Sequence, residues 1–313
     1  MRRHDRDASV DGEAMPAPNT ELTHEPVMRD EVVEMFGPRV HGVIADCTLG
    51  RGGHSEALLD AGSGRVIAID RDRSAIALAQ ARLARFADRV QYVHADYREL
   101  PAILADKGVA ALDGALADLG VSSMQIDDPA RGFSFRRDGP LDMRMDTSRG
   151  ATLADRLADV DERTLADVIF ELGEERHARR VARAIVHARA TRRLDRTGDL
   201  ASVVRRAAGS GRWQRLDPAT RTFQALRIWI NDELAGLGAF LRAAVDALAA
   251  GGRLVVIAFH SLEDRIVKQT ARAMERDAVG RVITRKPLVP AEAERQRNPR
   301  SRSARLRVVE KLA

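Results

Sequence analysis

The chain has 313 residues, of which 44% are hydrophobic and 31% are charged, and it carries a formal net charge of +5. This composition is typical of a globular protein with room for one large domain or two smaller ones. It has a polar N-terminus, no apolar run long enough to cross a membrane, and a single cysteine, Cys47. We therefore expect a cytoplasmic protein without a secretory signal, membrane span or disulfide framework.

Short apolar segments alternate with helical patterns in the first part of the chain. Residues 1–22 are polar, contain prolines and show no periodicity, so we predict a disordered extension there. Strands are expected at residues 43–49, 65–70, 90–96 and 114–120. The clearest helical pattern between them covers residues 73–86. This alternation predicts βαβ units and a parallel sheet.

A glycine cluster follows the first predicted strand and precedes a helical pattern. Gly50, Gly52 and Gly53 would bring bare backbone and N–H groups close to a nucleotide-like ligand. The spacing is Gly-x-Gly-Gly, which differs from the Gly-x-Gly-x-x-Gly of dinucleotide-binding loops. Asp46, four residues before Gly50, suits a ligand with a positive group, such as the amino-acid end of S-adenosylmethionine.

Two further predicted strands end in carboxylates. Asp70 ends the second strand, 17 residues after Gly53, where an acid commonly binds ribose hydroxyls in nucleotide-binding βαβ units. Asp118 ends the fourth strand, where it would face the reacting group of a cofactor, and a cationic sulfonium is a suitable neighbour for it. The alternative is an ordinary strand end that turns at Gly120.

Residues 133–216 contain no convincing strand. Thr152 and Asp155 have capping-box spacing, and helical patterns cover residues 174–190 and 197–207. The segment starts at the carboxyl end of the predicted fourth strand, where doubly wound sheets bind their ligands. We expect it to overhang that site as a substrate-recognition element.

After this segment the sheet pattern resumes. A long helix is predicted from Pro218 to about Ala250, followed by an apolar strand at 252–260 and an antiparallel pair at 281–288 and 304–312. The fold class is therefore α/β: a doubly wound, Rossmann-like sheet with an all-helical insertion between its fourth and fifth strands. The expected parts are residues 23–132 (first part of the sheet domain), 133–216 (helical insertion) and 217–313 (second part of the sheet domain).

Three other segments carry candidate site residues. His260, at the end of the fifth strand, would lie at the same sheet edge as Asp118. The segment Gly139–Asp146 mixes apolar side chains with Asp142 and other charged residues, which suits an ordered loop lining a site or a buried structural loop. Phe133 and Phe135 are suited to stacking on a base or to core packing.

The basic residues are clustered. Residues 171–230 contain 14 arginines and six acidic residues, and residues 295–311 contain seven basic residues and one acidic residue. Arginine pairs bidentately with phosphate and stacks on bases, so this distribution favours a nucleic-acid partner. The alternative is a set of helix faces that charged side chains keep solvated.

Taken together, several motifs resemble those of the bacterial 16S small-subunit ribosomal RNA (cytosine-N4)-methyltransferase family, which is class I and S-adenosylmethionine-dependent. The motifs are His24–Met28, Asp46–His54, Asp118–Ser123, Arg131–Phe135, Gly139–Asp146, Thr220–Ile230 and Phe259–Arg265. The resemblance extends from about Thr23 to Lys311. It implies methylation of the exocyclic N4 of a cytidine in the decoding centre of 16S RNA, near the P site, in the cytoplasm.

The resemblance also implies roles for single residues. The cofactor contacts would be Gly52, Gly53 and His54 at the methionine end, Asp70 at the ribose, Tyr97 by the adenine, and Asp118 and Gln125 completing the site. Independently of the resemblance, the clustering of charge leads us to expect RNA phosphate contacts from Arg179, Arg180 and Arg183. Arg221 and Arg227 would reach phosphate or only solvent. We expect no metal requirement, and the sequence leaves open whether the chain forms a homodimer.

Cytosine N4 is a poor nucleophile because its lone pair is delocalised into the ring. Hydrogen-bond acceptors aimed at its protons would stabilise the charge that develops during transfer. We expect Asp142 or Ser122 to position the amine, with His260 close by. The alternatives are a nucleotide-binding protein associated with RNA, a methyltransferase acting on another substrate, and a nicotinamide-dependent dehydrogenase.

Overall fold

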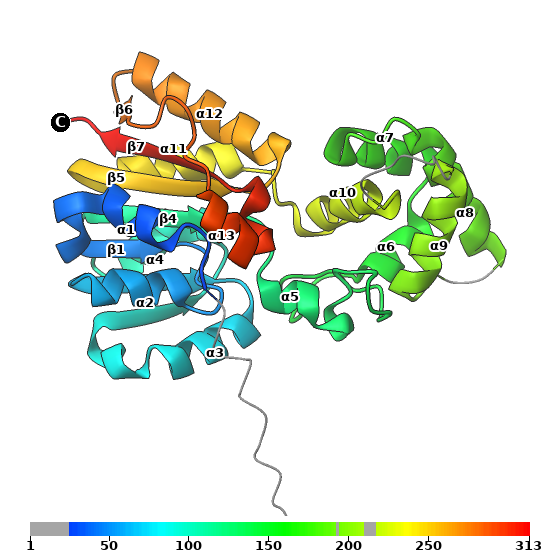
Figure 1. Cartoon of the computed structure of the whole chain (residues 1–313), viewed down its shortest axis with the longest axis horizontal. Coiled ribbons are helices and arrows are strands. Elements are labelled where there is room, and N and C mark those ends of the chain that lie inside the picture. The colour runs from blue at the N-terminus through cyan, green and yellow to red at the C-terminus, as the bar shows by residue number, and fades with distance from the viewer. Residues whose placement is uncertain (1–24, 192–193, 210–216) are drawn as a thin grey trace, which may run out of the picture.

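The computed structural model describes residues 25–191, 194–209 and 217–313. It has two bodies, an α/β sheet body and a body made only of helices, which lie side by side in Figure 1. The extension predicted at residues 1–22 lies outside the described residues. Within the described ranges, no helix combines the length and apolar character needed to cross a membrane.

One seven-stranded sheet forms the larger body, with the order β3-β2-β1-β4-β5-β7-β6. The strands are β1 (Val43–Asp46), β2 (Arg65–Asp70), β3 (Val90–His94), β4 (Leu112–Asp118), β5 (Leu248–Ala258), β6 (Gly280–Val282) and β7 (Arg305–Lys311). Strands β1 to β5 pair in parallel, and β7 runs antiparallel between β5 and β6. The predicted closing antiparallel pair is thus confirmed, and a bridge from Leu288 to Leu306 extends it.

Helices cover both faces of the sheet, because its central strands are apolar on both sides. In β2, for example, the four residues Val66–Ile69 are fully buried. One face is covered by α1 (Arg29–Phe36), α2 (Gly53–Asp60) and α3 (Arg73–Arg82), and the other by α4 (Leu100–Asp106), α11 (Leu237–Asp246) and α12 (Ser261–Arg276). The short helices η1 (Gly37–His41), η2 (Ala84–Arg89), η3 (Tyr97–Glu99), α13 (Glu292–Arg297) and η5 (Pro299–Ser303) complete this body.

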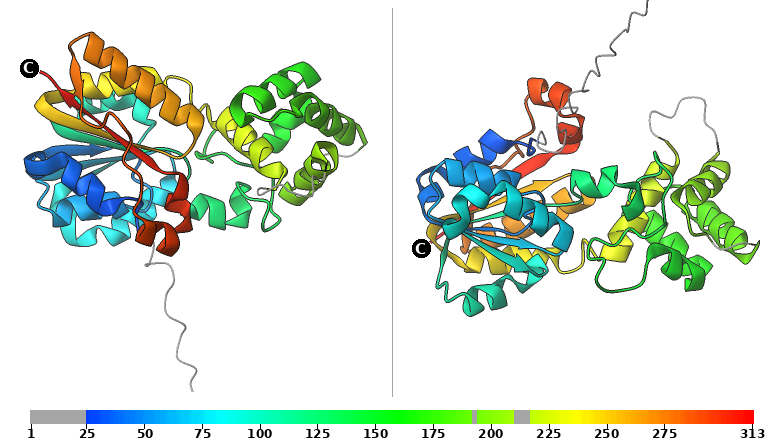
Figure 2. Two further views of the ribbon diagram at one scale, coloured as in Figure 1. Left: turned by 45° about the horizontal axis from the view of Figure 1, so that its top comes forward. Right: turned by 90° about the horizontal axis from the view of Figure 1, so that it is seen from below.

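The second body begins where β4 ends, as the predicted insertion requires. After α5 (Ser123–Asp127) and η4 (Pro129–Arg131) come α6 (Leu153–Asp159), α7 (Glu162–Gly173), α8 (Ala178–Thr191), α9 (Thr197–Ala208) and α10 (Ala219–Asn231). These last five helices share one apolar core. The capping box of Thr152 and Asp155 is present at the start of α6. Figure 2 shows the helical body beyond the carboxyl edge of the sheet in both views.

The prediction of one long helix from Pro218 to about Ala250 is wrong. The chain forms α10, then a turn with Asp232 at φ +49° and Gly236 at φ +72°, and then α11. The apolar stripe of α10 packs with the insertion, because Phe223, Leu226 and Ile230 lie in its core. The helical body therefore extends past the boundary predicted at residue 216.

Asn231 joins the two bodies at the end of α10. Its side-chain amide donates to the Met143 carbonyl (2.7 Å), and its amide oxygen accepts from the Met145 N–H (2.7 Å). Its own carbonyl accepts from Arg71, which follows β2. The two side-chain bonds hold the Gly139–Asp146 segment at the end of α10, and the Arg71 bond ties that helix end to the sheet body.

We expect Asn231→Ala to lower the free energy of unfolding by about 2 kcal/mol, because it leaves buried backbone groups without partners. Chemical denaturation of the full chain measures this loss. Asn298→Ala is the matched control, since Asn298 accepts one exposed bond from the Arg300 N–H. Equal losses in the two variants would contradict a special role for the junction.

Candidate active site

A cavity of about 600 Å³ lies at the carboxyl ends of the parallel strands, the edge at which such sheets bind ligands. One half is lined by residues that follow β1, β2, β3 and β4, including Thr48, Gly50, Gly53, His54, Asp70, Tyr97, Asp118, Ser122 and Gln125. The other half is lined by Arg136, Thr220, Gln224, Arg227, Glu233, Phe259, His260, Glu263 and Arg300. The cavity thus extends from the glycine loop to α10 and the start of α12.

Asp70 holds the glycine loop in shape. Its Oδ2 accepts from the Gly50 N–H (2.7 Å) and its Oδ1 from the Asp72 N–H (2.8 Å). Gly52 has φ +77°, and a Cβ there would lie 3.1 Å from the Leu83 side chain. A Cβ on Gly53 would lie 3.2 Å from Pro26. Glycine is therefore required at residue 52 for the backbone conformation and at both positions for close packing.

Two predicted cofactor residues lie behind the cavity wall. Asp46 is 1% exposed, accepts from the Ser55 hydroxyl (2.7 Å) and the Thr48 N–H (3.2 Å), and does not line the cavity. Burial raises the pKa of its carboxyl to about 6. Gly52 also lies outside the lining. The expected direct contact of Asp46 with a ligand is therefore corrected: its side chain ties β1 to α2.

His54 and Asp118 face each other across the cavity floor. His54 Nε2 lies 2.9 Å from the Val27 carbonyl oxygen, which can only accept, so Nε2 carries a proton. Its Nδ1 lies 3.6 Å from Asp118 Oδ2. Within the described part of the chain, Asp118 Oδ1 is covered and has no hydrogen-bond partner. Burial and the nearby carboxylates Asp46 and Glu263 raise the pKa of Asp118 well above its usual value.

Asp72 anchors Gln125, a residue of the cavity lining. Its carboxylate accepts from Gln125 (2.9 Å) and from Arg131 (2.7 Å), which also donates to the carbonyls of Arg144 and Met145. Burial alone would raise the pKa of Asp72, but the bonds from Ser74, Arg131 and Gln125 lower it. Asp72 thereby links the sheet body to the start of the insertion.

Tyr97 and Ser122 lie at the cavity as predicted. The Tyr97 ring packs against Phe240 with centroids 4.4 Å apart, and burial raises the pKa of its hydroxyl to about 12. Ser122 is the N-cap of α5, and its hydroxyl accepts from the Gln125 N–H. Both residues line the cavity, as Asp118 and Asp70 do.

Asp142 is not brought to the cavity. Its carboxylate receives two bonds from the Arg144 guanidinium (2.7 and 2.8 Å) and one from the Arg144 backbone N–H (3.0 Å), and it does not line the wall. Its backbone carbonyl accepts from the Leu153 N–H at the start of α6. The expectation that Asp142 holds the target amine is therefore corrected, because its carboxylate braces the Gly139–Asp146 segment.

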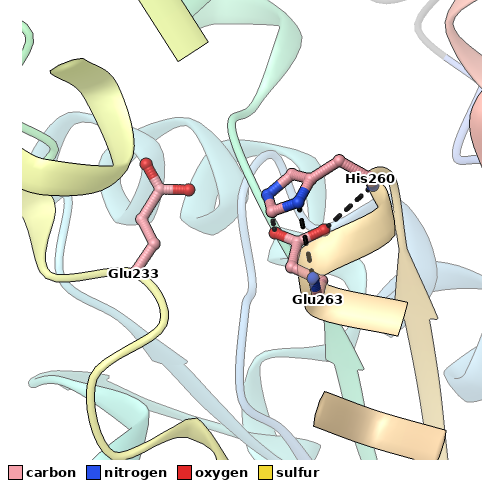
Figure 3. Close-up of side chains that lie close together, drawn as sticks. All are labelled: Glu233, His260 and Glu263. Atoms are coloured by element: carbon pink, nitrogen blue, oxygen red, sulfur yellow. Dashed lines mark hydrogen bonds and ion pairs between the residues drawn. The ribbon is translucent and has the colours of Figure 1, made fainter. Parts of the chain in front are cut away.

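Figure 3 shows His260 folded over Glu263, with Glu233 on a separate loop after α10. His260 caps α12: its Nδ1 accepts from the Glu263 N–H, and its Nε2 lies 3.1 Å from Glu263 Oε1. Both ring nitrogens therefore face Glu263, and His260 lines the cavity, where it was expected to lie close to the target amine. Atoms of Glu233, His260 and Glu263 lie within 4.8 Å of one another, a spacing that metal ligands also have. Arg227, however, donates to both oxygens of Glu233.

The predicted RNA-contacting arginines have different surroundings. Arg179 and Arg183 are exposed on α8, and Arg183 forms a solvent-exposed ion pair with Glu162 (3.3 Å). Arg180 donates to the Ala208 carbonyl, and Arg221 donates to that of Glu174. Arg227 lines the cavity, where its guanidinium pairs with Glu233, and its contact with RNA stays a prediction.

The alternative left open for Phe133 and Phe135 is settled by packing, and Cys47 is likewise a core residue. Phe133 is 9% exposed within the insertion core, and Phe135 makes an edge contact with Phe223, so both pack with the core. Cys47 is 2% exposed, and burial raises the pKa of its thiol, as for a small core side chain.

Sequence reasoning missed several residues of the site. Glu263 lies in the Phe259–Arg265 motif. Its position three residues after His260 is a capping-box spacing, which is the signal that places it at a helix start. Gln224 lies on the same face of α10 as Thr220 and Arg227, at helical spacing. Glu233 had no signal, because only the turn after α10 directs it to the cavity.

The parallel sheet with one antiparallel strand, the glycine loop, Asp70 and the cavity at the strand ends define a class I S-adenosylmethionine-dependent methyltransferase. The chain belongs to the MraW methylase family, whose profile matches residues 21–312. A protein of Acidiphilium cryptum named ribosomal RNA small subunit methyltransferase H is 50% identical, covering 93% of this chain and 98% of the relative. The protein of that name from Sorangium cellulosum is 50% identical, covering 95% and 93%.

Proposed function

We propose that this enzyme methylates the exocyclic N4 of a cytidine in the decoding centre of 16S ribosomal RNA, near the P site. The observation that carries the proposal is the single cavity that joins the glycine loop and Asp70 to a polar wall made by α10 and α12. The names of the relatives support a small-subunit RNA substrate. Such an enzyme works in the cytoplasm, where ribosomal subunits assemble.

The residues present fit S-adenosylmethionine. Asp70 offers carboxylate oxygens to the ribose hydroxyls, and the carboxyl of Asp118, which also lines the cavity, suits a ligand with positive charge. Tyr97 lines the wall where the adenine would lie, and Gln125, which also lines the cavity, completes the site. When bound, the cofactor supplies an electrophilic methyl group.

The chain's own groups then orient the acceptor. Carbonyl oxygens in the Leu119–Ser122 turn follow Asp118 at the cavity and suit hydrogen bonds from the N4 protons. Such preorganised acceptors stabilise the positive charge that N4 gains during transfer. Holding the two reactants in the correct orientation lowers the activation free energy by roughly several kcal/mol more, as it does in intramolecular reactions. A base in folded RNA would be flipped into the cavity at a cost of a few kcal/mol.

We expect S-adenosylmethionine affinity to fall as the pH is lowered. Because the pKa of Asp118 is raised, protons compete with the cationic ligand above the usual titration range of an aspartate, so binding strengthens with rising pH until Asp118 is ionised in the empty site. Calorimetry in buffers of different ionisation enthalpy measures the released proton. Asp118→Asn should remove the release, and persistence of the same proton count in that variant would contradict this account.

RNA affinity should fall steeply as salt rises, because arginine–phosphate contacts release counterions. The double variant Arg179→Ala/Arg183→Ala should reduce the slope of log affinity against log salt by about two. Filter binding of small-subunit RNA at several salt concentrations measures this. Arg242→Ala is the control, since Arg242 pairs with Asp277 on the sheet body. An unchanged slope in the double variant would place the RNA elsewhere.

Mass spectrometry of small-subunit RNA from a deletion strain tests the function. Loss of one N4-methylcytidine, restored by the gene, is the expected result, and unchanged RNA would refute the proposal. Activity retained after EDTA treatment would support the expectation that no metal is required. Saturable binding of NAD in place of S-adenosylmethionine would favour the dehydrogenase alternative.

A further inference from the structure

Glu263 is a buried carboxylate in the first turn of α12. It borders the cavity but is not among the residues assigned above to the cofactor or to the acceptor amine. It is 2% exposed. Its Oε2 accepts from the backbone N–H groups of Phe259 (2.9 Å) and His260 (3.3 Å), and the His260 ring lies against its Oε1. The protein thus fixes this carboxylate in one orientation: Oε2 accepts two backbone bonds, and Oε1 faces the His260 ring. Figure 3 shows the ring beside the carboxylate.

The carboxylate lies next to the end of β4. Its Oε1 is 4.0 Å from the position that a Cβ on Gly120 would occupy, two residues after Asp118. Gly120 belongs to the Leu119–Ser122 turn, whose carbonyl groups would face the acceptor in the proposed reaction. A target amine held by that turn therefore lies within reach of Glu263, since no Cβ at residue 120 intervenes.

The ionisation states of the two neighbouring carboxyls differ. Burial raises the pKa of Asp118. Burial also opposes ionisation of Glu263, but the His260 bond, Arg227 and the Phe259 N–H together hold its pKa below the usual value. Neighbouring carboxyls whose environments separate their pKa values mark distinct acid and base roles. Glu263 is the ionised member and can accept a proton.

We propose that Glu263 is a catalytic residue that accepts a hydrogen bond from the target N4 and then takes its proton, and that His260 is its positioning residue. This rests on the proposed function. N4 forms a bond to the methyl carbon while the carbon–sulfur bond breaks, and that electron pair stays on sulfur as a neutral thioether. The proton shed by the positively charged N4 passes to Glu263 Oε1, which becomes neutral.

Glu263→Gln tests the assignment, because the amide keeps the shape and one acceptor oxygen but cannot take the proton. We expect the single-turnover rate of cytidine methylation on small-subunit particles, at saturating S-adenosylmethionine, to fall about 100-fold. Calorimetry should show S-adenosylmethionine affinity unchanged within about threefold, which also establishes folding. Asp264→Asn is the matched control: Asp264 is the next buried acid of α12, but it binds Arg305 and Arg307 on β7.

The pH profile separates proton acceptance from a structural role. The wild-type rate should fall at low pH as Glu263 is protonated, and Glu263→Gln should remove that limb. The charged and titratable groups that face Glu263 are Asp118, Arg227, Glu233 and His260. Glu263→Asp, which retains a base on a shorter side chain, should recover part of the rate and the acid limb.

A wild-type rate in Glu263→Gln, or an equal loss in Asp264→Asn, would overturn the assignment. If Glu263→Gln does not fold, failure of Glu263→Asp to show an acid limb while binding S-adenosylmethionine would overturn it. If wild-type enzyme itself methylates no cytidine N4, the proposed function fails instead. The two failures are therefore distinguishable.

Discussion

Asp70→Asn is expected to weaken S-adenosylmethionine binding by about 100-fold, which corresponds to about 3 kcal/mol. The wild-type carboxylate accepts from the Gly50 N–H with one oxygen and from the Asp72 N–H with the other. Asparagine has only one oxygen, so its NH₂ group would face an N–H donor. The variant would lose charge-assisted bonds to the ribose and also deform the glycine loop, and a bond to a charged group contributes about 1.5–3 kcal/mol.

Isothermal calorimetry with S-adenosylmethionine measures the affinity, and thermal denaturation without ligand shows whether the variant folds. Asp60→Asn is the control, because Asp60 lies on the exposed face of α2 and pairs with Arg85 (2.9 Å). That control should bind like wild type. Affinity within threefold of wild type in a folded Asp70→Asn enzyme would contradict the placement of the ribose at β2.

The cofactor half of the site could be predicted because its signals are local in sequence. The order strand, glycine cluster, helix and strand places Gly50 and Asp70 at one sheet edge whatever the rest of the chain does. Parallel strand ends also bring Asp118 to that edge. The insertion was predictable for the same reason, since its helical periodicity interrupts the strand pattern.

The substrate half could not be predicted, because the partner of each charged side chain decides its role. Asp142 is a reasonable acceptor until Arg144 is seen to bind both its oxygens. The apolar stripe of α10 predicts a helix but does not say that it packs with the insertion. The position of Arg227 at the cavity follows from that packing, because the opposite face of α10 then points to the cavity.

Arg227→Met is expected to lower the free energy of unfolding by about 3 kcal/mol or more. The Arg227 guanidinium donates to both oxygens of Glu233 (2.9 and 2.8 Å), and the two side chains are only 16% and 5% exposed. Methionine fills a similar volume but leaves Glu233 buried without a counter-charge. Removal of one partner of a buried ion pair typically costs about 3–5 kcal/mol.

The double variant Arg227→Met/Glu233→Gln separates lost charge balance from lost packing. If the unpaired carboxylate causes the instability, neutralising it should recover most of the loss, because a buried ion pair contributes little net stability compared with neutral side chains of similar size. Urea denaturation of wild type, Arg227→Met, Glu233→Gln and the double variant gives the coupling free energy between the two side chains. Strictly additive losses would show that the two side chains act independently. Recovered stability without recovered methylation would show that the cavity wall also needs the Arg227 charge, which acts on Glu263 as well.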